Sequence, residues 1–227
     1  MSSTSSPSPA IPQITILITD PDYATAFTTA AKTHSLPPSL QITTTHNLLS
    51  TLPANTSFDA IVSPANSYGL MDGGFDDALS RAFSPRTDYG ALTRVAKRAI
   101  YDSHFGFLPP GACAIADLED ARGKEGELKE NPWGCRYLVV LPTMKIPQDV
   151  TWDREVVYEC VWTMCAAVER HNRRVREEED GGREIGSLLM TPLATGYGKV
   201  SKEKWAFVWF GGCCSRVRAV VIQMFFF

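Results

Sequence analysis

The sequence has no excess of positive charge and no long apolar run, and its first residues lack the pattern of a secretion signal. Its 22 Lys and Arg residues are outnumbered by 25 Asp and Glu residues, which gives a formal net charge of -3. Because binding to phosphate backbones needs clustered cations, we expect no nucleic-acid partner. The apolar stretch at residues 219–227 is far below the roughly 20 residues that a membrane helix requires, so we also expect no membrane partner.

Cysteine pairs spaced as CxxC are absent too, although the chain contains six cysteines. They are scattered through apolar segments, at Cys113, Cys135, Cys160, Cys165, Cys213 and Cys214. This distribution is typical of reduced, buried thiols, so we expect no disulfide framework, no metal site and a cytoplasmic or nuclear location. Residues 1–12 are rich in Ser, Thr and Pro and lack the basic start and apolar core of a signal peptide, so we expect a disordered tail.

A chain of 227 residues is long enough for one well-buried domain with insertions and short for two. We therefore expect a single domain over residues 13–227. Residues 117–134 carry charges of both signs and predict a solvated surface insertion on a hairpin. Residues 206–227 form an atypical C-terminus, because Gly211 and Gly212 interrupt the expected long helix. Residues 217–225 are consistent with a last strand or with an ending that is not native.

Strand and helix patterns alternate along the rest of the chain. A run containing Ile14, Ile16 and Ile18 predicts a strand, and Asp20 with Pro21 favours the start of a helix directly after it. Similar patterns predict strands near residues 14–18, 40–45, 58–62, 112–116, 137–141 and 185–190, and helices near residues 22–32, 76–83, 89–104 and 153–176. This alternation indicates a layered α/β fold, whose ligands usually bind at the carboxyl ends of the central strands.

The loop at residues 63–76 follows a buried strand and precedes a helix. Gly69, Gly73 and Gly74 permit backbone angles that other residues rarely adopt and let amides approach a ligand closely. The helix start that follows offers free N–H groups to an anion. A diphosphate is the ligand that fits this arrangement best.

Two polar side chains in the same loop are candidates for ligand contact. Asn66 supplies both a donor and an acceptor for sugar hydroxyls, and Asp76 places a carboxylate at the helix entrance. The alternative is structural, with Asn66 capping a turn and Asp76 capping the helix.

A second loop, at residues 192–198, also follows an apolar strand. Thr195 and Gly196 offer amides and a hydroxyl to a phosphate, and Tyr197 is placed to pack on a sugar or base. An ordinary turn explains the same residues equally well. None of the four histidines lies in either loop, so a histidine base has no candidate.

Residues 58–80, FDAIVSPANSYGLMDGGFDDALS, resemble the DAIVNAAN…GGGGVDGAIH signature of macro domains, the Appr-1″-p processing-like family. The later segments GACAIA, YLVVLPTM and LLMTPLATGYG resemble further strands and the second ligand loop of that family. The segments SPAN, MDGG and PTM are similar to those of one subset of the macro domain family. The resemblance covers roughly residues 14–205.

This resemblance implies a three-layer α/β/α sandwich with a central mixed β-sheet and a cleft for ADP-ribose or an ADP-ribosylated protein or small molecule. It implies that Asn66 contacts the distal ribose, that Gly73 and Gly74 hold the phosphates, and that Asp76 orients the ribose and a water. Asp76 and Asn66 are thus the expected catalytic residues. The expected ligand-binding residues are Asn47, Ser63, Ala65, Asn66, Gly69, Met71, Asp72, Gly73, Gly74, Phe75, Thr195, Gly196, Tyr197 and Gly198.

The chain departs from the family pattern at several of these positions. Ser63 replaces the first asparagine, Met71 and Asp72 replace two glycines, and Asn47 stands where an aspartate usually meets the adenine amine. The retained Asp76 favours an ADP-ribosyl hydrolase, whereas the departures favour a non-catalytic ADP-ribose or nucleotide-binding module, or a relative with another ligand. We expect a monomer that needs no cofactor and no metal.

Overall fold

The computed structural model describes residues 12–35, 40–122, 128–178 and 182–226, with side chains except at 178 and 216–226. Six strands form one sheet in the order β2-β1-β6-β3-β5-β4. In chain order they are β1 (Gln13–Ile18), β2 (Ile42–His46), β3 (Ala60–Ser63), β4 (Ala114–Asp117), β5 (Tyr137–Val140) and β6 (Ser187–Met190). All neighbouring pairs are parallel except β4 and β5, which makes the sheet mixed.

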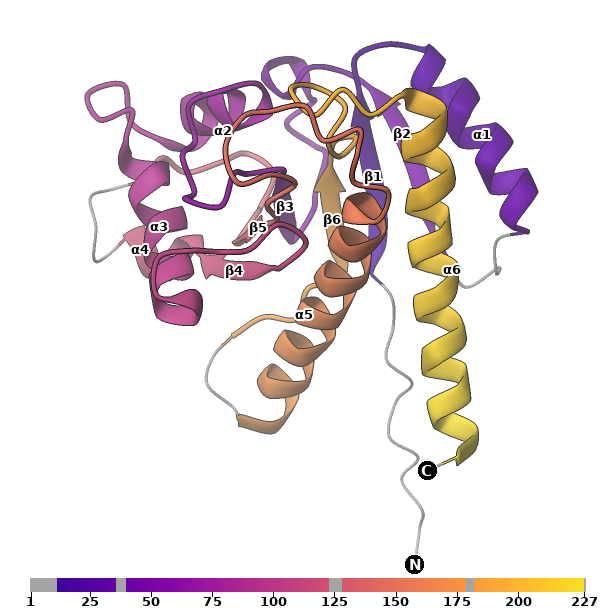
Figure 1. The fold of residues 1–227 in the computed structure, drawn as a ribbon. Helices are drawn as coiled ribbons and strands as arrows, with labels where there is room; N and C mark the ends of the chain where they lie inside the picture. The colour runs from indigo at the N-terminus through magenta and orange to yellow at the C-terminus, as the bar shows by residue number, and fades with distance from the viewer. Residues whose placement is uncertain (1–11, 36–39, 123–127, 179–181, 227) are drawn as a thin grey trace, which may run out of the picture.

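Helices cover both faces of this sheet (Figure 1). They are α1 (Asp22–His34), α2 (Phe75–Phe83), α3 (Ala91–His104), α4 (Leu118–Arg122), α5 (Val156–Glu178) and α6 (Lys202–Phe226), with a short 3-10 helix η1 (Leu49–Thr51). Figure 1 shows β2 at the right-hand edge of the sheet, beside α1 and α6, and β4 at the left-hand edge, beside α3.

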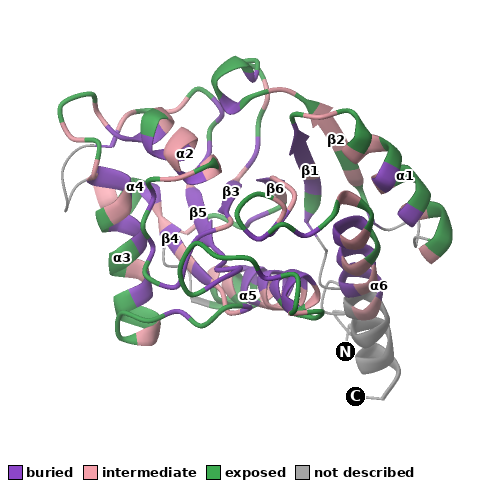
Figure 2. Cartoon of the chain, turned by 45° about the horizontal axis from the view of Figure 1, so that its top comes forward, coloured by how far each residue is buried: buried purple, intermediate pink, exposed green. Residues whose placement is uncertain are grey.

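The alternation of side chains along each strand divides the core in two. Ile14 and Ile16 belong to a buried cluster that includes residues of α1, α5 and α6. Leu17 and Ile61 point the other way, into a cluster built with α2 and α3. Figure 2 shows the buried residues in purple between the helical layers. The expectation of a three-layer α/β/α sandwich with a mixed sheet is confirmed. Outside the C-terminal segment, the strands and helices that the sequence predicts begin and end within a few residues of their predicted positions.

The C-terminal segment departs from expectation, because Lys202–Phe226 is one long helix rather than a short helix followed by a strand. The glycine pair does not end this helix. A Cβ atom on Gly212 would lie 3.1 Å from the Cβ of Val161 in α5 and 3.3 Å from the carbonyl oxygen of Tyr158. Glycine therefore permits the close packing of α6 against α5, which a sequence pattern read along one helix does not reveal.

The insertion at residues 117–134 does connect two antiparallel strands, but its described part is not wholly at the surface. It begins with α4, and the side chains of Leu128 and Trp133 are buried in the cluster below α2 and α3. Trp133 stacks on Phe58 with ring centroids 5.8 Å apart. These contacts tie the connection to the core.

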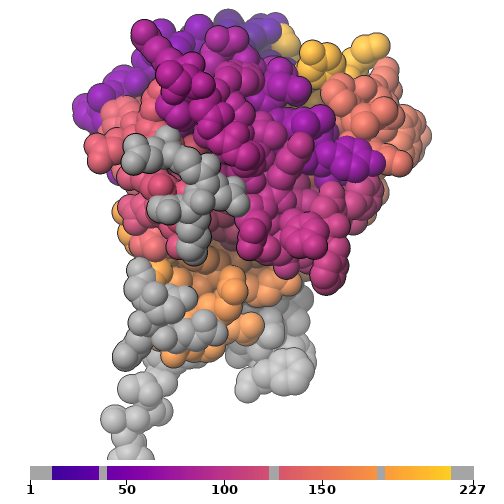
Figure 3. Space-filling model, turned by 90° about the vertical axis from the view of Figure 1, so that its left-hand side faces the viewer, coloured from indigo at the N-terminus to yellow at the C-terminus, as the bar shows by residue number. Residues whose placement is uncertain are grey.

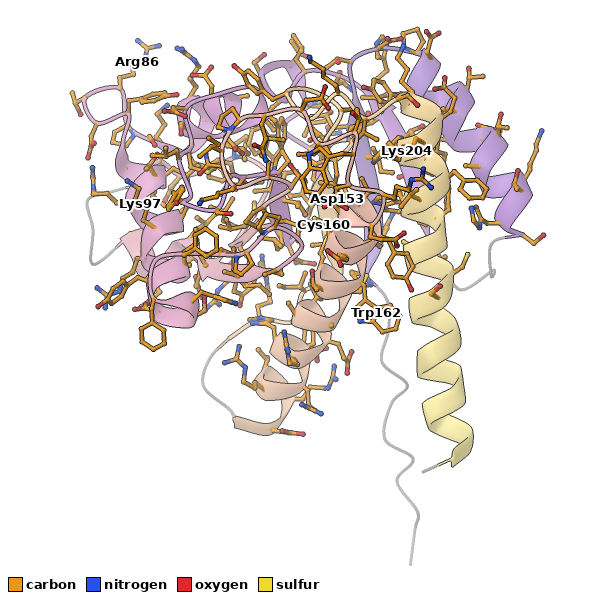
Figure 4. The ribbon with its side chains drawn as sticks, viewed as in Figure 1. Arg86, Lys97, Asp153, Cys160, Trp162 and Lys204 are labelled. Atoms are coloured by element: carbon orange, nitrogen blue, oxygen red, sulfur yellow. The ribbon has the colours of Figure 1, made fainter. Side chains whose placement is uncertain are left out.

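Hydrogen bonds from the first turn of α6 hold the loops above the sheet. The Lys204 ammonium donates to the carbonyl oxygens of Thr151 (3.2 Å) and Asp153 (3.5 Å), close to the start of α5 (Figure 4). Lys202 bonds to the carboxylates of Asp20 and Asp22 at the start of α1. Within the described residues, no helix has the length and apolar character needed to span a membrane.

Candidate functional site

A cavity of about 420 Å³ lies where the parallel strands end. Its wall takes residues from five loops: Thr19 after β1, Leu48 after β2, residues between 64 and 76 after β3, Thr143 after β5, and residues 191–198 after β6. The position is that of ligand sites in layered α/β folds, and the volume suits a small organic molecule.

The first loop folds back on itself through the side chain of Asn66. Its carboxamide oxygen accepts the backbone N–H groups of Tyr68 (3.0 Å) and Leu70 (3.4 Å), and its amide group donates to the Leu70 carbonyl (3.3 Å). Asn66 is buried yet borders the cavity. The turn-capping alternative therefore describes what this side chain does in the structure, where it shapes the cavity wall.

Asp76 does not cap the helix that it opens. Gly74 occupies the cap position of α2 without a side-chain bond, and Asp76 instead accepts a 2.6 Å hydrogen bond from the hydroxyl of Ser63, at the end of β3. Both side chains are buried. Because β3 and α2 pack together here, the loop between them brings the hydroxyl and the carboxyl into contact.

Burial changes the acid–base behaviour of Asp76. Loss of water around the carboxylate raises the pKa of Asp76 to about 7, and the nearby charge of Asp72 adds to this rise. The hydrogen bond from Ser63 acts in the opposite direction, because it stabilises the ionised form. Asp76 therefore changes its protonation state near neutral pH, which is the property required of a general acid or base.

Met71 and Gly69 serve packing rather than the cavity. Met71 is fully buried, and its carbonyl oxygen accepts a 2.6 Å hydrogen bond from the Ser80 hydroxyl in α2. Gly69 has a positive φ of 65°, and a Cβ atom there would lie 2.8 Å from the side chain of Ile100 in α3. These two positions anchor the loop to the helices beneath it.

The second loop is a tight turn held by its own backbone. The N–H of Val200 donates to the carbonyl of Ala194 (3.1 Å), and Ala194 itself has a positive φ of 59°. Gly198 is required at its position, because a Cβ atom would lie only 2.4 Å from the Ala194 carbonyl oxygen. The Thr195 hydroxyl donates to the carbonyl of Pro192 (3.1 Å).

The two glycine-containing loops approach each other across the cavity. A Cβ atom on Gly73 would lie 3.6 Å from the ring of Tyr197, which is 63% exposed. Several backbone N–H groups in the two loops have no hydrogen-bond partner within the described part of the chain: those of Gly73, Gly74, Phe75, Thr195, Gly196 and Tyr197. Such groups, three of them at the start of a helix, are suited to binding an anion.

The structure brings most of the predicted site residues together. Those that line the cavity are Ala65, Asn66, Asp72, Gly73, Gly74, Phe75, Asp76, Thr195, Gly196, Tyr197 and Gly198. Four others do not line it: Ser63, which lies behind Asp76, Gly69 and Met71, which pack on the helices, and Asn47. The carboxamide of Asn47 donates to the Thr45 hydroxyl (3.0 Å), and its backbone N–H pairs with the Ile18 carbonyl.

Sequence reasoning missed another part of the wall. It is formed by Thr19, Tyr23, Leu48, Leu49 and Ser50 on one side and by Thr143, Met144 and Pro147 on the other. The signal that was available is position, since Thr19 directly follows a predicted strand and Leu48 and Thr143 come within three residues of two others. Among the described residues, no group of His, Cys, Asp and Glu side chains is arranged to hold a metal ion.

No protein-family model matches the chain. Among solved structures, it is similar to the Oceanobacillus iheyensis macrodomain with MES bound, at 14% identity and a TM-score of 0.50, over 73% of this chain and 73% of that one. A mutant of that macrodomain with ADPR gives 14% identity and a TM-score of 0.49, over 71% and 72%. The same macrodomain with ADP gives 12% and 0.44, over 75% and 88%. The first likeness and the mixed sheet between helical layers show that the chain has the macrodomain fold.

Proposed function

We propose that the cavity binds ADP-ribose, free or attached to a protein or small molecule. The observation that carries this proposal is the group of unpartnered backbone N–H groups that the two glycine-containing loops bring to one cavity. No Lys or Arg lines that cavity among the described residues, so a diphosphate there would depend on N–H dipoles and on the start of α2. We also propose that the chain belongs to the subset with SPAN, MDGG and PTM segments, all three of which contribute residues to the cavity wall.

The nucleoside would then contact mainly apolar groups. Tyr23, Leu48 and Leu49 line the cavity beyond the ends of β1 and β2, whereas Asn47 does not. A site that holds a base by apolar packing distinguishes between different bases less strictly than a site that holds it by a buried hydrogen bond. We therefore expect other nucleoside diphosphates to compete with ADP-ribose more effectively here than at a site with an adenine-binding carboxylate.

Hydrolysis of ADP-ribosyl conjugates is the further activity that the site supports. Asp76 borders the cavity, its pKa is raised to about 7, and Ser63 fixes the orientation of its carboxyl. In its ionised form it would orient and activate a water for attack on the distal ribose. One observation supports the non-catalytic alternative: the Asn66 carboxamide, expected to be catalytic, already forms hydrogen bonds with backbone groups of its own loop.

Calorimetric titration with ADP-ribose tests binding, and Gly73→Ala is the variant that tests its location. The added methyl group would stand 3.6 Å from the Tyr197 ring, an ordinary contact that narrows the gap between the loops without strain. We expect affinity to fall about tenfold. Gly90→Ala, at the start of α3 and outside the cavity, is the matched control and should bind like the wild type.

Absence of heat with ADP-ribose would refute the ligand assignment, and heat with a different nucleotide would then indicate a changed ligand. Release of ADP-ribose from a mono-ADP-ribosylated protein, measured on the same samples, separates the two activities. Release by the wild type but not by Asp76→Asn, with binding retained in both, supports the hydrolase. Binding without release by either protein makes this a non-catalytic module.

A further inference from the structure

A second hollow, separate from the cavity described above, lies along the free edge of the sheet. Its volume is about 820 Å³, and its floor is the continuous stretch from Cys113 to Asp117, which includes all of β4. Residues of α3 form one wall and residues of α5 the other, and Asp120 and Ala121 of α4 also border the hollow. Figure 3 looks at this side of the molecule, with α3 in magenta across the middle and orange residues of the region around α5 beneath it.

The strand at the floor of this groove has one unpaired side. β4 ends the strand order and pairs only with β5. Within the described residues, no hydrogen bond connects the backbone of Ala114–Asp117 to a partner on the other side. The N–H and C=O groups of Ile115 and Asp117, which are both half-buried, face away from β5. Unpaired groups of this kind at a sheet edge are a template for another extended chain.

The two walls differ in charge. On α3, Arg98 is paired with Asp102 through contacts of 3.0 Å, and the other residues at the wall include Val95 and Ala99. On α5, Arg170, Arg173 and Arg174 are exposed and form no ion pair within the part of the chain that the structure describes. The acid at the end of the floor, Asp117, is already paired with Arg136 at 2.8 Å. Asp120 of α4 also lines the groove and has an interaction partner of its own. The charged groups of the groove that form no ion pair among the described residues are therefore the arginines on the α5 side.

Side chains of a strand bound in this groove would alternate between the walls, as those of β4 do. Ala114 and Ala116 pack in the cluster on the α3 side, whereas Cys113 and Ile115 pack on the α5 side. Because the period of a strand is two residues, a neighbouring strand sends every second side chain towards the arginines of α5. The rest face α3, where Val95 and Ala99 lie beside Ser103 and the paired Arg98 and Asp102.

We propose that this groove binds an extended acidic peptide segment of a partner protein, which adds to β4 as a seventh strand. Its sequence alternates acidic residues, facing α5, with small apolar residues, facing α3. Main-chain hydrogen bonds to β4 provide affinity, and the two unlike walls provide the preference for alternation. This site is independent of the ADP-ribose proposal.

A fluorescent peptide of about eight residues with alternating glutamate and valine is a suitable probe, monitored by polarisation. Two control peptides have the same composition: one with all the glutamates before the valines, and one with alternate backbone amides N-methylated. We expect the alternating peptide to bind at least about tenfold more tightly than either control. Amide hydrogen exchange at Ile115 and Asp117, whose N–H groups face away from β5, should slow when it binds.

The double variant Arg170→Glu/Arg174→Glu changes only exposed side chains and should weaken binding at least about tenfold. Arg154→Glu, exposed ahead of α5 and outside the groove, is the matched control and should bind like the wild type. Three results would overturn the proposal: no binding of the alternating peptide at about 1 mM, equal binding of the block peptide, or binding without protection of β4. The last of these would reveal a simple polyanion site on the arginines.

Discussion

Replacing the buried acid of the cavity, Asp76→Asn, should make the protein more stable at alkaline pH and leave it unchanged at acidic pH. The asparagine is close to the same size, stays neutral at every pH, and can still accept the hydrogen bond from Ser63. In the wild type, the carboxyl is neutral at low pH and ionised above neutrality. The variant therefore lacks the titration of this carboxyl and otherwise differs little from the wild type.

The size of the effect follows from the two pKa values. Asp76 titrates near its ordinary value of 3.8 when unfolded and at about 7 when folded. Between these values the folded state holds a proton that the unfolded state has lost, so the free energy of unfolding falls as pH rises through this range. Each pKa unit corresponds to about 1.4 kcal/mol, which makes the full loss above pH 7 on the order of 4 kcal/mol.

Urea unfolding followed by tryptophan fluorescence, from about pH 4 to pH 8, measures this difference, because Trp205 and Trp209 are fully buried. Other titrating groups are common to both proteins and cancel in the difference between the two curves. We expect the variant to gain a few kcal/mol over the wild type as pH rises, with nearly all of the gain complete by about pH 8. Parallel curves would show that Asp76 is not held in a buried, neutral form, and the reasoning about the site would fail with it.

Three further predictions test the hydroxyl beside Asp76, the helix packing and the start of β6. Ser63→Ala removes the bond that lowers the pKa of the buried acid, so the fall in stability should move to higher pH in the same urea titration. Gly211→Ala should raise the free energy of unfolding by about 0.5–1 kcal/mol through helix propensity. Gly212→Ala should instead leave the protein about 1–3 kcal/mol less stable than Gly211→Ala, because its methyl group meets α5. Asn172→Ala, which leaves the backbone N–H and C=O of Ile185 without their buried partner, should cost about 1–3 kcal/mol by thermal or urea unfolding.

The sheet and most of its helices could be predicted because local pattern and tertiary environment agree. Ile14, Ile16 and Ile18 are β-branched and become buried on one face of a central strand, as their spacing indicates. The C-terminal helix could not be predicted in the same way. Gly212 is unfavourable for an isolated helix, and its advantage exists only where α6 meets Val161 of a distant element.

The candidate site shows the same division. Its two loops were predictable, since a glycine-containing segment directly after an apolar strand is a local signal. The contact between Ser63 and Asp76 was not, because it depends on how a loop of intervening residues folds back between β3 and α2. The wall at Leu48 and Thr143 carries no local signal beyond its place after a strand. Only the assembled sheet brings such positions together.

The charge of Asp76 also connects the two proposed activities. None of the described residues that line the cavity is cationic. A diphosphate there is bound more easily when the adjacent carboxyl is neutral, because an ionised Asp76 would add like-charge repulsion. Activation of a water requires the opposite state, with the carboxylate ionised. A pKa of about 7 places both states within reach near neutral pH. Under the proposed function, ligand binding would favour the protonated cavity and turnover the ionised one. Retention of ADP-ribose should then dominate in mild acid, and hydrolysis should increase only as pH rises above neutrality.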